Sequence, residues 1–222
     1  MIISKDRLPN LKKNGFIVIE GVNGAGKTTV KSHIVSVLKN KNLPFIETFE
    51  PGDTALGKEL RRLLLDDDRN IKSKLAELFL FAADRAEHVN CLIKPAIENK
   101  QIVVCDRYYY STTAFQGHGR QNDLNLIDTI NKIAVCDTYP DLVILLDIDA
   151  QSGLSRNKQN QIGGNSFSVD ALEKESLDFH NKIRQGFLEI AENSAEPFIV
   201  IDASRDKEVV LQEVQEVMLA YL

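Results

Sequence analysis

The chain has 222 residues, of which 27 are basic and 32 acidic, so its formal net charge is −5. Its 43% hydrophobic and 27% charged residues exclude wholesale disorder and fit one globular domain. The acidic balance argues against a dedicated nucleic-acid-binding protein, and no apolar run reaches the roughly 18 residues of a membrane span. Because Cys91, Cys105 and Cys136 are widely spaced and no secretory signal precedes them, we expect reduced core cysteines and a cytoplasmic location.

Taken in chain order, the sequence begins with a polar segment and then alternates apolar runs with amphipathic stretches. Residues 1–14 are polar and contain Pro9, which predicts a loose arm before a single domain of residues 15–222. Nearly all-apolar runs predict strands that are buried on both faces of a parallel sheet, at residues 16–19, 45–48, 102–105, 142–146 and 198–201. Amphipathic periodicity predicts helices at residues 29–38, 75–89 and 170–191. The alternation predicts an α/β fold, a three-layer α/β/α sandwich with a five-stranded parallel sheet.

A phosphate-binding loop follows the first predicted strand. Residues 21–28, GVNGAGKT, fit the pattern G-x-x-x-x-G-K-[ST], and a predicted helix begins directly after them. The glycines let successive backbone N–H groups point at phosphate oxygens, and the helix N-terminus adds positive potential. Lys27 would reach the β- and γ-phosphates, and the Thr28 hydroxyl would contact Mg²⁺. This context predicts the P-loop NTPase fold and an ATP site formed by Gly21, Val22, Asn23, Gly24, Ala25, Gly26, Lys27, Thr28 and Thr29.

The residues after the third predicted strand favour a transferase over a GTPase. The segments NKNL at residues 40–43 and NKQN at residues 157–160 lack the aspartate of the guanine-reading N-K-x-D motif, and no D-x-x-G follows the third strand. Asp106 and Arg107 stand there instead. Asp106 is placed to act on Mg²⁺ or its waters, and the planar guanidinium of Arg107 can bind a second phosphate. A second, anionic substrate is what a phosphotransferase requires.

The combined motifs resemble those of thymidylate kinases, P-loop nucleoside monophosphate kinases that transfer the γ-phosphoryl group of ATP to dTMP. The matching segments are IEGVNGAGKTT at residues 19–29, FEPGDT at 49–54, LFLFAADR at 78–85, DRYYYSTTAFQG at 106–117, PDL at 140–142 and DALEKESLDF at 170–179. Together they cover essentially the whole predicted domain. The resemblance implies a dTMP kinase that depends on Mg²⁺ and ATP, acts in dTTP biosynthesis and forms a homodimer packed through helices.

The resemblance also implies roles for individual residues. Arg107 would bind the dTMP phosphate, Phe81 would stack on thymine, and Arg85 would reach the carbonyl edge of the base. Thr112 and Gln116 would line the base pocket, Ser111 would also bind the substrate, and Glu50 and Pro51 would form the wall on the acceptor side. Asp106 and Glu173, with Thr28, would organise Mg²⁺, and residues 157–169 would form a lid over the ATP.

Two departures from the family pattern leave other functions open. Asn23 stands where the family usually has a carboxylate, and Asp170-Ala171 stands where the lid usually carries an Asp-Arg pair. Arg156 and Lys158 are the remaining cations near the lid, so we assign them to catalysis beside Lys27 and Arg107. The alternatives are a kinase for another pyrimidine monophosphate, such as dUMP, and a catalytically weak nucleotide-binding sensor.

Overall fold

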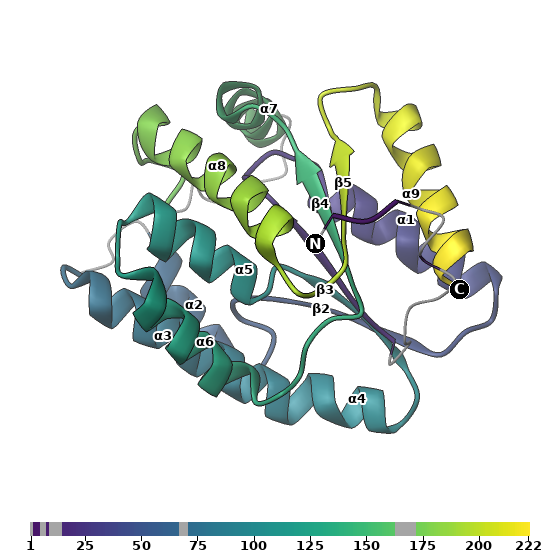
Figure 1. The fold of residues 1–222 in the computed structure, drawn as a ribbon, viewed down its shortest axis with the longest axis horizontal. Helices are drawn as coiled ribbons and strands as arrows, with labels where there is room; N and C mark the ends of the chain where they lie inside the picture. The colour runs from purple at the N-terminus through teal and green to yellow at the C-terminus, as the bar shows by residue number, and fades with distance from the viewer. Residues whose placement is uncertain (1, 5–7, 9–14, 67–70, 163–171) are drawn as a thin grey trace.

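The computed structural model describes residues 2–4, 8, 15–66, 71–162 and 172–222 (Figure 1). Its centre is a parallel sheet of five strands in the order β2-β3-β1-β4-β5. The strands are β1 (Phe16–Gly21), β2 (Phe45–Phe49), β3 (Ile102–Asp106), β4 (Leu142–Asp147) and β5 (Phe198–Asp202). The prediction of a five-stranded parallel sheet is confirmed, and each predicted run lies within one of these strands.

The central strand β1 shows why the apolar runs form strands. All six of its residues are buried, because β3 and β4 flank it and helices cover both faces. Val18 is in register with Cys105 of β3 and with Val143 of β4, so these three strands end at the same edge. Ligands of parallel α/β sheets bind beyond this carboxyl edge, where the P-loop and Asp106 lie.

Helices cover the sheet on two sides. On one side, α1 (Lys27–Asn40) packs against α9 (Lys207–Tyr221), as Figure 1 shows. On the other side, α4 (Lys94–Glu98), α5 (Tyr109–Thr112) and α8 (Leu177–Asn193) contact the strands. The remaining elements are α2 (Ala55–Leu65), α3 (Lys74–His88), α6 (Leu124–Val135), α7 (Ala150–Ile162) and the π-helical turns Val89–Ile93 and Thr113–Gly119. This arrangement is the predicted α/β/α sandwich.

Two predictions at the proposed lid are wrong in their boundaries. The helix expected over residues 170–191 begins at Leu177, because the Ser176 hydroxyl accepts the N–H of Phe179 and caps α8 there. Residues 172–174 form a turn, and residues 170–171 lie outside the described part of the chain. The loop expected over residues 157–169 is helical as far as Ile162, the last residue of α7. Residues 163–169 of that segment lie outside the described residues.

The described part of the N-terminal arm packs on the domain, contrary to the expectation of a loose segment. Ile3 and Leu8 are buried in the main core, and the Ile3 N–H donates to the carbonyl oxygen of Phe198 at 2.9 Å. The expectation of core cysteines holds only for Cys105, because Cys91 and Cys136 are exposed, and all three thiols are free.

Candidate active site

The P-loop wraps the start of α1 at the carboxyl end of β1. Gly24 has φ 78°, and a Cβ at this position would lie only 1.9 Å from the carbonyl oxygen of Gly153 in α7, so only glycine fits. The Lys27 side chain is buried, and its ammonium donates to the carbonyl oxygens of Gly21 at 3.1 Å and Val22 at 3.0 Å. The loop is therefore compact, with the lysine inside it.

A groove runs from the P-loop to the segment after β5. It contains residues from the predicted ATP and metal sites together with residues after β5 that the sequence interpretation did not include, namely Ala203, Arg205 and Lys207. Arg156 lines this groove and donates to the carbonyl oxygens of Ala203 at 2.7 Å and Ser204 at 3.2 Å. Lys158 is exposed and does not line the groove, so the structure does not bring it to the other predicted catalytic residues.

A second, adjacent pocket gathers every residue predicted to bind the acceptor. These residues come from β2–α2, α3 and the segment after β3, and they are Glu50, Pro51, Phe81, Arg85, Arg107, Ser111, Thr112 and Gln116. Leu65, Tyr108, Phe115 and Leu172 complete much of the apolar lining. The pocket therefore combines an aromatic and aliphatic wall with a few charged and amide groups, as expected of a small-molecule site.

The pocket and the groove meet at four residues. Asn23, Glu50, Arg61 and Arg107 line both. A ligand phosphate in the pocket and a phosphate on the P-loop would therefore lie on either side of the same side chains. This common border is the geometry that transfer between two bound phosphates requires.

Arg107 is held firmly at this border. Its φ of 70° is left-handed, which is unusual for a residue other than glycine. One terminal nitrogen donates to the Gly21 carbonyl oxygen at 3.1 Å and to the Ser111 hydroxyl at 3.0 Å, and the other donates to Oδ1 of Asn23. A guanidinium has five N–H donors, so two remain without a partner among the described residues. Those two can bind an anionic ligand.

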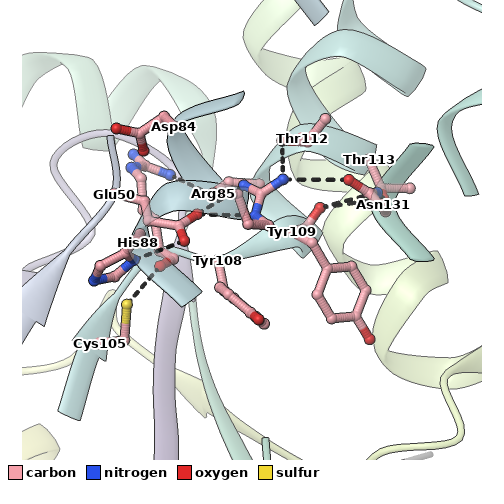
Figure 2. Close-up of polar contacts among 12 residues, drawn as sticks. Glu50, Asp84, Arg85, His88, Cys105, Tyr108, Tyr109, Thr112, Thr113 and Asn131 are labelled. Atoms are coloured by element: carbon pink, nitrogen blue, oxygen red, sulfur yellow. Dashed lines mark hydrogen bonds and ion pairs between the residues drawn. The ribbon is translucent and has the colours of Figure 1, made fainter. Parts of the chain in front are cut away.

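Glu50 and Arg85 of the pocket lining are the centre of a buried polar network (Figure 2). The Arg85 guanidinium contacts one Glu50 oxygen through Nε at 2.9 Å and through a terminal nitrogen at 2.8 Å. Its other terminal nitrogen donates to Thr112 Oγ1 at 3.0 Å and to Asn131 Oδ1 at 3.2 Å. The resemblance gave Arg85 a role at the base edge, and the structure fixes its guanidinium on Glu50 and Thr112 of the pocket lining and on Asn131 of α6.

His88 and Asp84 extend this network on α3. Nδ1 of His88 lies 2.8 Å from Glu50 Oε1, and Nε2 lies 2.6 Å from the Thr48 hydroxyl, which donates to Asp53. Asp84 accepts the N–H of Gly52 at 3.0 Å. Burial, reinforced by the nearby Glu50 charge, raises the pKa of Asp84 to about 6.

Three residues near the site were missed by the sequence interpretation. Glu20 is fully buried in β1, where an acid in an apolar strand was the available signal. His88 lies one turn after Arg85 on the same helix face. Arg61 follows the buried Leu60 of α2 and faces both cavities, and its guanidinium donates to the Pro51 carbonyl oxygen at 2.7 Å. The helical spacing of Gly57, Leu60 and Leu64 could have indicated that Arg61 borders the buried face.

The groove contains oxygen ligands that fit Mg²⁺. Thr28 and Asp106 both line it, and within the described residues the Asp106 carboxylate accepts no hydrogen bond. Glu173 lies in the same groove but accepts hydrogen bonds from Asn23 at 3.2 Å and Asn157 at 2.6 Å. No cluster of three or more His, Cys, Asp or Glu ligands occurs in the described ranges. Magnesium in phosphoryl-transfer sites needs only one or two carboxylates beside phosphate oxygens and water, so the set is sufficient.

Comparison with known proteins identifies the family. Residues 19–214 match the family model of thymidylate kinase. Curated thymidylate kinases from Desulfovibrio desulfuricans and Trichormus variabilis are 41% and 40% identical to the chain, each covering 93% of it and 96% of the relative. A crystal structure of thymidylate kinase from Ehrlichia chaffeensis matches with a TM-score of 0.71 and 32% identity over 91% of this chain and 97% of that one. No helix in the described ranges is long and apolar enough to cross a membrane. The chain belongs to the thymidylate kinase family.

Proposed function

We propose that the pocket binds dTMP and the groove binds ATP, and that the chain transfers the γ-phosphoryl group of ATP to dTMP, giving dTDP and ADP. The observation that carries this assignment is the common border formed by Asn23, Glu50, Arg61 and Arg107. It lets one set of side chains contact both the acceptor phosphate and the transferred group. The two N–H donors of Arg107 that have no partner in the described part of the chain provide a fork for the acceptor phosphate.

The reaction needs no covalent enzyme intermediate. An oxygen of the acceptor phosphate forms a bond to the γ-phosphorus while the bond from that phosphorus to the β,γ-bridging oxygen breaks. The acceptor oxygen is ionised near neutral pH, so no strong general base is required. Lys27 and Arg107 would neutralise charge on the two sides of the transferred group, and positioning would supply most of the remaining rate enhancement.

The base of the acceptor would lie against the apolar wall of the pocket. Phe81 presents a ring on which a pyrimidine can stack, and Arg85, Thr112 and Gln116 carry the polar groups at that end. The Gln116 amide nitrogen donates to Glu77 Oε1 at 3.0 Å, which fixes the amide and leaves its oxygen as an acceptor. An N–H donor of the pyrimidine ring would complement that oxygen.

Magnesium would be held by Thr28 and Asp106, with Glu173 as a further ligand of its water shell. When bound, the ion neutralises the phosphate charge that the protein's cations leave uncompensated. We assign Arg156 and Lys158 to the transferred group as the cations nearest the lid. Arg156 has the stronger support, because its side chain already lines the groove.

The chain would act as a homodimer in the cytoplasm. Exposed apolar side chains gather on two helices that pack together, with Leu75 and Phe79 on α3 and Leu126 and Ile133 on α6. Phe79 is 52% and Ile133 74% exposed, which leaves a hydrophobic face for a second copy. Sedimentation of the protein and of Phe79→Asp tests this face, and a monomeric wild-type protein would exclude the proposed dimer.

Three free thiols fit the reducing compartment that a cytoplasmic location implies.

The decisive experiment measures ADP release from Mg-ATP with dTMP, dUMP, UMP, dCMP or dGMP, beside a reaction without acceptor. Stimulation by dTMP is expected, and Arg107→Ala should abolish it while ATP binding persists. If another monophosphate alone stimulates ADP release, that monophosphate replaces dTMP as the assigned acceptor and the proposed mechanism is retained. No stimulation by any acceptor, with ATP bound, would replace the kinase by a nucleotide sensor.

A further inference from the structure

Glu20 is a fully buried acid that none of the proposed catalytic roles uses. It is the fifth residue of β1 and directly precedes the first residue of the P-loop. The backbone ladder continues past β3 beside it, because the N–H of Arg107 donates to the Ile19 carbonyl oxygen at 3.0 Å. The strand therefore places the Glu20 carboxylate under the segment that carries Arg107.

The carboxylate holds this segment through three hydrogen bonds. Glu20 Oε1 accepts the backbone N–H groups of Tyr108 at 2.8 Å and Ser111 at 3.2 Å. Glu20 Oε2 accepts the Ser111 hydroxyl at 2.6 Å. An ionised carboxylate is an acceptor at both oxygens, so it satisfies all three donors.

The Ser111 hydroxyl links the acid to the arginine. A hydroxyl has one hydrogen to donate, and its acceptor is Glu20 Oε2 at 2.6 Å. The hydroxyl oxygen is then free to accept the N–H of Arg107 at 3.0 Å. A protonated Glu20 would compete for that oxygen and leave the serine hydrogen without its acceptor. The ionised acid therefore determines the direction in which the serine presents its lone pair.

We propose that Glu20 is a positioning residue that orients the Arg107 guanidinium for the acceptor phosphate through the Ser111 hydroxyl. This inference rests on the proposed function, in which Arg107 binds that phosphate. Glu20 touches no ligand-binding cavity itself, since it lines neither the pocket nor the groove. Its effect must therefore pass through Ser111 and the backbone of the Arg107 segment.

The surroundings of Glu20 make its charge sensitive to pH. Burial raises its pKa to about 7, against the opposing effects of Arg107, the Ser111 and Tyr108 hydrogen bonds and Lys27. The charged groups facing it are Arg107 and Lys27, and the neighbouring titratable group on β3 is the Cys105 thiol. Orientation of Arg107 should accordingly improve as the pH rises through about 7, the value at which Glu20 ionises.

The test compares calorimetric binding of dTMP and thymidine, which differ by the phosphate alone. Glu20→Gln keeps the shape and one acceptor oxygen but removes the charge, so it should weaken dTMP binding roughly tenfold and leave thymidine binding unchanged. Ser111→Ala should have a similar effect, and the double variant should lose no more than the larger single loss. Ser111→Thr, which retains the hydroxyl, should restore the preference for dTMP.

The pH profile supplies a second measurement. The wild-type preference for dTMP over thymidine should increase between pH values of about 6 and 8 more steeply than in Glu20→Gln, because the variant lacks the ionisation of Glu20. The inference would be overturned if Glu20→Gln had the wild-type ratio of dTMP affinity to thymidine affinity. It would also be overturned if the losses of dTMP affinity in the two single variants were strictly additive in the double variant. If Glu20→Gln fails to fold, the ratio measured on Ser111→Ala decides. A wild type without preference for dTMP over thymidine would instead refute the proposed role of Arg107.

Discussion

The Arg85 guanidinium and the Glu50 carboxylate form an ion pair at 2.8 Å in which the side chains are only 2% and 3% exposed. Thr112 and Asn131 occupy the remaining terminal nitrogen of Arg85, and His88 occupies the other Glu50 oxygen (Figure 2). The pair joins the end of β2 to α3 in the lining of the acceptor pocket. Its charges are compensated within the protein, so loss of either partner leaves a buried charge.

Glu50→Ala should therefore destabilise the fold strongly. Removal of one partner of a buried ion pair typically costs about 3–5 kcal/mol, because the other charge is left without compensation. Urea unfolding measures the change. Glu59→Ala is the matched control, since Glu59 pairs with Arg62 in a bridge whose side chains are 69% and 68% exposed. Equal midpoints for the two variants would contradict the structural importance of the buried pair.

Which nitrogen of His88 matters is a separate prediction. Nδ1 lies 2.8 Å from Glu50 Oε1, and an N–H at this nitrogen donates to that carboxylate oxygen. His88→Asn places an amide N–H where Nδ1 lies and should keep the contact with Glu50. The longer side chain of His88→Gln places its amide toward Thr48 and should lose the contact with Glu50. The KM for dTMP should then rise roughly tenfold. The KM for ATP should stay constant in both variants. Equal KM values for dTMP in the two variants would exclude a special role for Nδ1.

Asp84 predicts a pH dependence of stability. Its pKa is about 6 in the folded protein against 3.8 ordinarily, so the folded state binds the proton more tightly. Stability from this group is therefore present at low pH and is lost as the pH rises from about 4 to about 6, by at most about 3 kcal/mol. Relative to Asp84→Asn, the wild type should weaken over that interval in urea unfolding. A difference that stays constant with pH would contradict the prediction, and Asp128→Asn, at an exposed ion pair, is the control.

The fold was largely predictable because its signals are local. Strands buried on both faces need apolar side chains at nearly every position, so β1 and β4 are visible as short apolar runs. The start of α8 was missed because the apolar periodicity extends back to Leu172. The Ser176 N-cap instead makes Leu177 the first residue of the helix. The packing of Leu8 was missed because its neighbours in the sequence are polar.

Beyond the P-loop motif and the Asp106-Arg107 pair, the site was predictable only where the resemblance named residues. Glu20 contacts Ser111, 91 positions later, and Arg85 contacts Glu50, 35 positions earlier. Such partners are brought together by the parallel sheet, and the sequence alone gives no spacing that joins them. Phe81 illustrates the same limit, because a pocket aromatic and a core aromatic occupy the same helical stripe. The resemblance placed it in the acceptor site, and the structure puts its ring in the pocket wall.

Arg61 and Arg62 provide a matched test of the common border. Arg61 lines the pocket and the groove, whereas Arg62 is an exposed residue paired with Glu59. Arg61→Ala should lower kcat/KM for dTMP by about 10–100-fold, the range for loss of a hydrogen bond to a charged group. Arg62→Ala should change it little. Steady-state assays at saturating ATP make the comparison, and indistinguishable variants would remove Arg61 from the acceptor site.

The catalytic contributions of Arg156 and Lys158 can be distinguished by the same kind of paired substitution. An arginine that contacts the transferred phosphoryl group contributes about 10³–10⁵ in rate in other P-loop enzymes. Arg156 is tied to the carbonyl oxygens of Ala203 and Ser204 within the groove, while Lys158 is exposed two residues further along α7. We expect Arg156→Ala to produce the larger loss of kcat. Lys158→Ala should lower kcat less and leave the KM for dTMP unchanged, with recovery in Lys158→Arg. An unaltered kcat in Lys158→Ala would exclude Lys158 from the chemistry and leave Arg156 as the cation that we assign to the transferred group beside Lys27 and Arg107.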